Sequence, residues 1–177
     1  MTAFLYLALF LPITAPAYTW ARDVSLRLHG VFPALQPLKP YETGFDPGNE
    51  LYGWQDIARQ VENIRTRMPH PETTFIFGHR FYTTSQLAVY LSPGIAATSL
   101  FHRYSQYRLW FIAEKYAGWD ALFVVDLKHH QGRARRYMPL FERMDPQPVE
   151  IKVFRNGRPA HVLQVYKYYG FKGKYEE

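Results

Sequence analysis

The sequence predicts an α/β fold, a small three-layer sandwich with a mostly parallel sheet and a C-terminal antiparallel hairpin, preceded by one apolar N-terminal helix. Three observations lead to this prediction. Apolar residues recur at helical spacing within residues 49–69, and short continuous apolar runs such as 120–127 are typical of strands covered on both faces. An Asn-Gly turn lies between two strand-like segments near the end of the sequence. Helices that alternate with buried strands build layered sheets.

The first helix of the soluble part is predicted within residues 49–69, which Pro69 ends. Its apolar residues are three or four positions apart and define one face of a helix. They are Leu51, Trp54, Ile57, Val61, Ile64 and Met68. Trp54 is expected in the core.

The remaining elements follow from shorter patterns. Residues 83–91 begin with Thr and Ser, which suit a helix start, and residues 133–144 are predicted as a helix despite Pro139. Residues 73–78, 96–101 and 120–127 are the predicted buried strands. A hairpin of residues 149–154 and 161–169 is predicted around Asn156 and Gly157.

The opening run decides the domain organisation. Residues 2–21 carry no charge, and about twenty apolar residues are what a helix needs to cross a bilayer. We therefore expect a transmembrane helix over 1–21, a Pro-rich connector over 22–45 and a soluble α/β domain over 46–177. A secretory signal cleaved after Ala-Pro-Ala at 15–17 is the alternative, and a buried helix is a third interpretation that Pro12 and Pro16 disfavour.

Charge and composition narrow the classes of partner. The formal net charge of +6 favours anionic partners such as nucleic acid, anionic lipid or phosphate-bearing substrates. The chain has no cysteine, which excludes disulfides, thiolate catalysis and cysteine-based zinc sites. The basic stretch 128–136 carries no recognised nucleic-acid motif, so a solvated loop or a membrane-surface contact is at least as good an interpretation.

Basic side chains follow each of the three predicted buried strands. If the strands are parallel, these side chains meet at the carboxyl edge of the sheet, where open α/β sheets usually bind ligands. His, Arg and Lys gathered there would suit a phosphate or carboxylate, although solvated loops are also commonly charged. The residues are His79, Arg80, His102, Arg103, Lys128, His129 and His130.

Metal and cofactor chemistry find little support. His129 and His130 are adjacent on a predicted loop and lack a well-spaced third ligand, so no metal site is expected. Ser99 and Ser105 have histidine neighbours but no nucleophile-elbow glycines, and the sequence has no phosphate-binding glycine loop. We therefore expect no cofactor.

Four short motifs occur in order along the chain, and they are Gly53-Trp54, Tyr90-Leu91, Gln106-Tyr107 with Trp110, and the stretch 118–124. This series resembles the carboxy-terminal region of bacterial membrane glycosyltransferases of family 39, relatives of protein mannosyltransferases and of the lipid A aminoarabinose transferase. The similarity covers about residues 46–173 and is based on the order and spacing of the motifs.

The resemblance implies that residues 1–21 are the last span of an inner-membrane enzyme and that the soluble domain lies on its extracytoplasmic side. Such enzymes take polyprenyl-phosphate-linked sugars, and their catalytic acids lie in an amino-terminal loop that no part of this chain matches. The chain is then an accessory domain, inactive alone, whose partners are the membrane, the lipid-linked sugar or glycan acceptor, and the catalytic membrane portion. Nucleic acid is not expected.

The resemblance also completes the set of expected contacts. Gln106, Tyr107 and Trp110 join the strand-end residues as contacts to substrate or lipid phosphate, with a purely structural role as the alternative. Two other functions stay open. One is an exported anion- or ligand-binding domain with a cleaved signal, and the other is a basic nucleic-acid-binding module.

Overall fold

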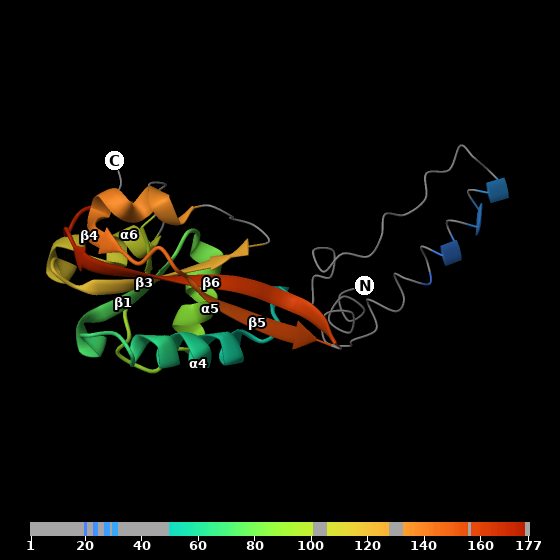
Figure 1. The fold of residues 1–177 in the computed structure, drawn as a ribbon, viewed down its shortest axis with the longest axis horizontal. Helices are drawn as coiled ribbons and strands as arrows, with labels where there is room; N and C mark the ends of the chain where they lie inside the picture. The colour runs from blue at the N-terminus through green and yellow to red at the C-terminus, as the bar shows by residue number, and fades with distance from the viewer. Residues whose placement is uncertain are drawn as a thin grey trace. The chain divides into compact units, whose positions relative to one another are not determined.

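The computed structural model describes residues 50–100, 106–127, 133–155 and 157–175, and a few positions between 20 and 31 (Figure 1). The predicted transmembrane helix over 1–21 and the connector over 22–45 therefore lie almost wholly outside the described residues. Within the described part, no helix combines the length and the apolar character needed to cross a membrane. The chain divides into two compact units, residues 53–153 with 161–177 and residues 1–52 with 154–160. The elements below belong mainly to the first.

The predicted α/β fold is confirmed. The described residues form a six-stranded sheet in the order β2-β1-β3-β6-β4, with β5 also paired to β6. β1 is parallel to β2 and to β3, whereas β6 is antiparallel to β3 and β4. The strands are β1 (Thr74–Gly78), β2 (Ala97–Ser99), β3 (Asp120–Asp126), β4 (Phe141–Met144), β5 (Val149–Arg155) and β6 (Arg158–Phe171).

Helices and 3₁₀ turns cover both faces of this sheet, and Figure 1 shows α4 below it and η4 above it. The α-helices are α4 (Trp54–Arg65), α5 (Phe81–Tyr90) and α6 (Gln106–Trp110). The 3₁₀ turns are η2 (Pro71–Thr73), η3 (Ala113–Tyr116) and η4 (Ala134–Leu140).

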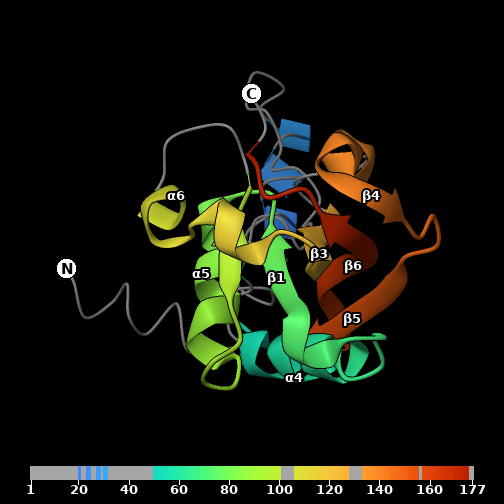
Figure 2. The same ribbon diagram turned by 90° about the vertical axis from the view of Figure 1, so that its left-hand side faces the viewer.

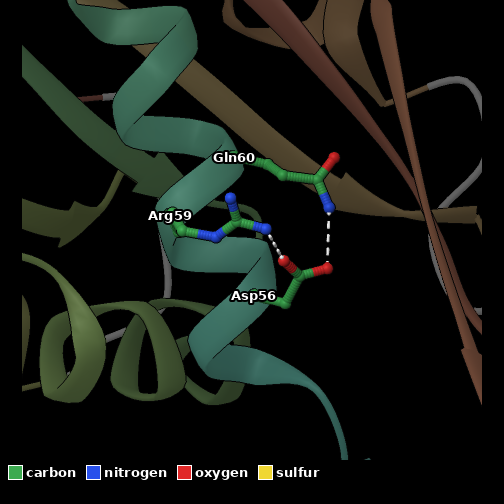
Figure 3. A network of polar contacts seen from close by, with 3 residues as sticks. All are labelled: Asp56, Arg59 and Gln60. Carbon is green, nitrogen blue, oxygen red and sulfur yellow. Dashed lines mark hydrogen bonds and ion pairs between the residues drawn. The ribbon is translucent and has the colours of Figure 1, made fainter.

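α4 follows the predicted apolar spacing. Trp54, Ile57, Val61 and Ile64 are buried, and Met68 is buried just beyond the helix. Leu51 is the exception, because the helix begins at Trp54 and leaves Leu51 exposed before it. The outer side of α4 is polar, and Figure 3 shows Asp56 accepting hydrogen bonds from Arg59 and Gln60. α4 is thus an ordinary amphipathic surface helix.

The two faces of the sheet hold chemically different cores. Alternate residues of a strand point to opposite faces, so Ile76, Leu122 and Val124 pack under α4 and α5. Phe75, Phe77 and Phe123 point to the other face. That second core is mainly aromatic, and its other large members are Phe111, Tyr137, Phe141, Tyr168 and Phe171.

The prediction of one helix over 133–144 is wrong. Residues Ala134–Leu140 form a 3₁₀ helix, and Phe141–Met144 form strand β4 instead. Pro139 has no amide hydrogen to continue an α-helix, and the following Phe141 is extended and pairs with Phe171 of β6. Tyr137 and Leu140 are buried against the aromatic core, and sheet pairing therefore ends the helical turn.

The predicted hairpin is present as β5 and β6, and Gly157 has the positive φ of 73° that its turn requires. Asn156 lies outside the described residues. β6 is longer than expected and is not at the edge of the sheet, because it also pairs with β3 through residues 163–168. β6 thus lies inside the sheet, and both β4 and β5 pair with it.

Candidate functional site

The carboxyl ends of β1, β2 and β3 lie at one edge of the sheet. Gly78, the last residue of β1, is opposite Ser99 of β2 and Val124 of β3, and both pairings are parallel. The strand arrangement that a common basic edge requires is therefore present. Of the basic residues expected there, His79 and Arg80 are described, and the others lie outside the described residues. Those others are His102, Arg103, Lys128, His129 and His130.

His79 is buried rather than presented at the edge. Its side chain points to the aromatic core, and its Nδ1 atom lies 2.7 Å from the hydroxyl of Tyr137. Its backbone carbonyl accepts a hydrogen bond from Ser99 Oγ at 3.4 Å. These contacts make His79 a polar anchor between β1, β2 and η4, and they hold its ring away from any ligand in solution.

Arg80 is exposed directly before α5. Its backbone is extended, with φ −125° and ψ 163°, and its carbonyl accepts hydrogen bonds from the amide and the hydroxyl of Thr84. The Thr84 hydroxyl also lies 3.0 Å from the Thr98 carbonyl, so the start of α5 is fixed to β2. The Arg80 guanidinium makes no ion pair with any described residue. Among the described basic residues at this edge, Arg80 is therefore the one that an anion can reach.

The three motif residues of α6, which are Gln106, Tyr107 and Trp110, differ in their surroundings. The Tyr107 hydroxyl donates to Ser85 Oγ of α5 at 2.9 Å, and its ring contacts that of Trp110 at 5.7 Å between centroids. Gln106 is exposed, and 68% of the Trp110 surface is exposed. Tyr107 thus has the structural role of joining α6 to α5, whereas Gln106 and Trp110 are open to solvent.

A buried carboxylate–imidazole pair lies at the end of β3. His161 Nδ1 is 2.9 Å from Asp126 Oδ2, and both side chains are almost fully buried. Because a carboxylate only accepts hydrogen bonds, Nδ1 carries the proton and donates it. The Trp54 ring lies 5.0 Å from the imidazole, at a tilt of 58°. His161 Nε2 is buried and has no hydrogen-bond partner in the described part of the chain.

The two buried histidines face opposite sides of the sheet. His79 continues the alternation of Phe75 and Phe77 toward the aromatic core, whereas Asp126 continues that of Leu122 and Val124 toward α4. They therefore belong to separate environments and do not form one constellation. The described residues contain no group of three metal-ligating side chains.

The Asp126–His161 pair was not predicted from the sequence. Asp126 is visible as the acid that ends a strand, and His161 as the first residue of a predicted hairpin strand. Nothing in either local pattern shows that β6 lies next to β3, which is what brings the two together. The available signal was that His161 is in line with the apolar residues Leu163 and Val165, two and four positions further on, where a polar side chain needs a buried partner.

Comparison of the chain with protein families, with curated proteins and with solved structures finds no match.

Proposed function

We propose that this chain is an accessory C-terminal domain of a membrane glycosyltransferase that uses a polyprenyl-phosphate-linked sugar, and that it does not transfer sugar alone. The observation that carries the proposal is the exposed Arg80 at the carboxyl edge of three parallel strands. A guanidinium in that position offers several donors to a phosphate. Exposed aromatic side chains nearby, such as Phe81, suit the prenyl chain or a sugar.

The placement of the resembling motifs is consistent with the proposal. Gly53 has a φ of 77° at the start of α4, and Gly118 has a φ of 83° two residues before β3. Tyr90 is the last residue of α5 and Leu91 follows as its cap. Gly53, Tyr90-Leu91 and Gly118 thus lie at the ends of elements, whereas Gln106, Tyr107 and Trp110 belong to α6 itself.

In this proposal the catalytic step and the binding of lipid or acceptor belong to different parts of the enzyme. No part of the sequence matches the loop that carries the catalytic acids of such enzymes, so the chemistry belongs to the membrane portion of the transferase. This domain would hold the lipid phosphate or the glycan acceptor beside it, on the extracytoplasmic side of the inner membrane. Arg80, Gln106 and Trp110 are the described residues exposed for that contact.

Binding of polyprenyl phosphate in detergent micelles tests the phosphate contact. The full chain is titrated with polyprenyl phosphate and, separately, with phosphatidylglycerol, and Arg80→Ala is compared with Arg67→Ala. Both arginines are exposed, but Arg67 lies near the start of β1, at the opposite edge of the sheet. We expect Arg80→Ala to weaken polyprenyl phosphate binding about fivefold, since a basic residue near an anionic surface contributes about 1 kcal/mol.

Two results would contradict the proposal. Equal losses in the two arginine variants would mean that the domain is merely basic, because the change in net charge is the same. Transfer of sugar from a polyprenyl-phosphate donor by the purified chain alone would overturn the accessory role. We expect no such transfer.

A further inference from the structure

β5 is a seven-residue strand with an open edge. In the described part of the chain, β6 is the only strand that pairs with it. Figure 2 shows β5 on the side of the sheet away from α5 and α6. At the other end of the sheet, β2 has only three residues, Ala97–Ser99. An edge strand presents backbone amides and carbonyls with which a further strand can pair. The open edge of β5 is therefore the place where another strand can join this sheet.

The side chains of β5 alternate between two environments. Ile151 and Val153 are buried in the core under α4, whereas Glu150 and Lys152 are exposed on the other face. A lysine on an edge strand often prevents further pairing, because its charge is difficult to cover. Here the Nζ atom of Lys152 lies 2.6 Å from Oε1 of Glu150. One face of the open edge thus carries two opposite charges, two residues apart.

Two copies of β5 in antiparallel orientation match each other in one register. With the twofold axis at Ile151, Glu150 lies opposite Lys152 of the second copy, and the reverse pair follows by symmetry. On the other face, Val149 lies opposite Val153 of the second copy. Each cross-strand pair then joins opposite charges or two apolar side chains, and such pairs stabilise a sheet. An axis at Glu150 or Lys152 would instead place like charges opposite each other.

We propose that two copies of this chain join through the open edges of β5, in the register centred on Ile151, and form one continuous sheet. A second copy is the partner that the charge pattern favours, because the edge of β5 is complementary to itself. Both copies use the same surface, so the contact closes with two copies and does not continue into a filament. This inference goes beyond the proposed function, because it concerns assembly and requires neither lipid phosphate nor sugar.

Reversal of the two charges tests the register. The chain has no cysteine, so Asn63→Cys on the exposed side of α4 gives one labelling site. Full chains labelled with a donor or an acceptor dye are mixed in detergent micelles without polyprenyl phosphate, and energy transfer between them measures association. We expect Glu150→Lys and Lys152→Glu each to weaken association about tenfold, because like charges then meet in both pairs. A mixture of the two variants should restore association, because opposite charges meet again.

Asp56→Lys and Arg59→Glu are the matched controls. They change the net charge by the same amounts on the outer side of α4, so neither should alter energy transfer. All four side chains are at least 42% exposed, so the fold tolerates the changes, and unchanged circular dichroism checks this.

Three results would overturn the inference. One is the absence of energy transfer between unaltered chains, which is also the result expected if residues 22–45 of the same chain cover the edge. The others are equal losses in Glu150→Lys and Asp56→Lys, and a mixture of the two β5 variants that restores nothing. Because no polyprenyl phosphate is present, these results leave the phosphate-binding test of the proposed function unaffected.

Discussion

Asp126 and His161 link β3 to β6 through a side-chain contact inside the core. An ion pair or strong hydrogen bond in that position is costly to break from one side, because the remaining partner stays buried. The contact also fixes which residues of the two strands are neighbours. At the scale of single residues, it is the feature of this domain whose removal has the clearest expected consequence.

His161→Ala and Asp126→Ala should each destabilise the domain by about 2–4 kcal/mol, since each change leaves a buried polar partner behind. The double variant should lose less than the sum of the two, because neither side chain of the pair then stays buried without the other. Urea unfolding of the four proteins measures this coupling. Additive losses would mean that the two side chains do not act as a pair.

The buried phenol of Tyr168 makes the stability of the domain depend on pH. Burial raises the pKa of its phenol well above the ordinary value, and Tyr137 and Tyr166 raise the pKa further. Its hydroxyl donates a hydrogen bond to the carbonyl of Ala134. The folded state therefore keeps this phenol neutral at a pH where the unfolded chain ionises it.

The stabilisation that follows is complete below the ordinary tyrosine pKa of about 10 and is lost as the pH rises above it, by up to about 1.4 kcal/mol per pH unit. Tyr168→Phe should cost about 1 kcal/mol at pH 7 through the lost hydrogen bond. It should also flatten the decline in unfolding free energy between pH 10 and 11. Parallel curves for the two proteins over that range would contradict the assignment.

At the scale of elements, local sequence patterns predicted the helices and strands that depend on short-range spacing. The spacing of Trp54, Ile57 and Val61 gave α4, and the continuous apolar runs gave β1 and β3. The segment 133–144 was predicted wrongly because the pairing of Phe141 with Phe171, which lies far away in the sequence, overrides its helical composition. The inner position of β6 was missed for the same reason, since strand order is not a local property.

Two glycines allow the cost of a strained turn to be separated from the cost of a clash. A Cβ atom at Gly157 meets nothing within 4 Å, so Gly157→Ala should cost only the strain of positive φ, about 1–2 kcal/mol. At Gly53 the added Cβ would also lie 2.5 Å from Val153 Cγ1. We therefore expect a lower melting temperature for Gly53→Ala than for Gly157→Ala.

The glycine comparison has an internal control. Gly157→Asn should be milder than Gly157→Val, because Asn tolerates the left-handed region and a β-branched residue does not. Equal melting temperatures for these two variants would show that Gly157 does not hold the turn conformation described for the β5–β6 hairpin.

At the scale of the whole molecule, the candidate site was predictable only where topology is simple. Parallel strands bring their ends to one edge, so a basic edge that includes Arg80 could be expected from the sequence. The burial of His79 could not be predicted, because it depends on the contact with Tyr137 of η4, which is far away in the sequence.

The apolar opening run gives a prediction for the full chain. As a membrane span, residues 1–21 should keep the protein in the membrane fraction through an alkaline carbonate wash, which removes proteins held only at the surface. A soluble form that begins at Tyr18 would instead establish cleavage of a secretory signal. N-terminal sequencing of the washed fractions distinguishes the two results.

The inner position of β6 has a consequence for biosynthesis. β1, β2 and β3 leave the ribosome first, and β6 begins only at Arg158. At about 5–20 residues per second, the growing chain spends a few seconds with the backbone of β3 open along one side. An unpaired, fully buried strand such as Asp120–Asp126 invites pairing with other chains during that interval. The domain therefore completes its sheet only after β6 has been synthesised, and its yield in cells should depend on chaperones that shield β3 until then.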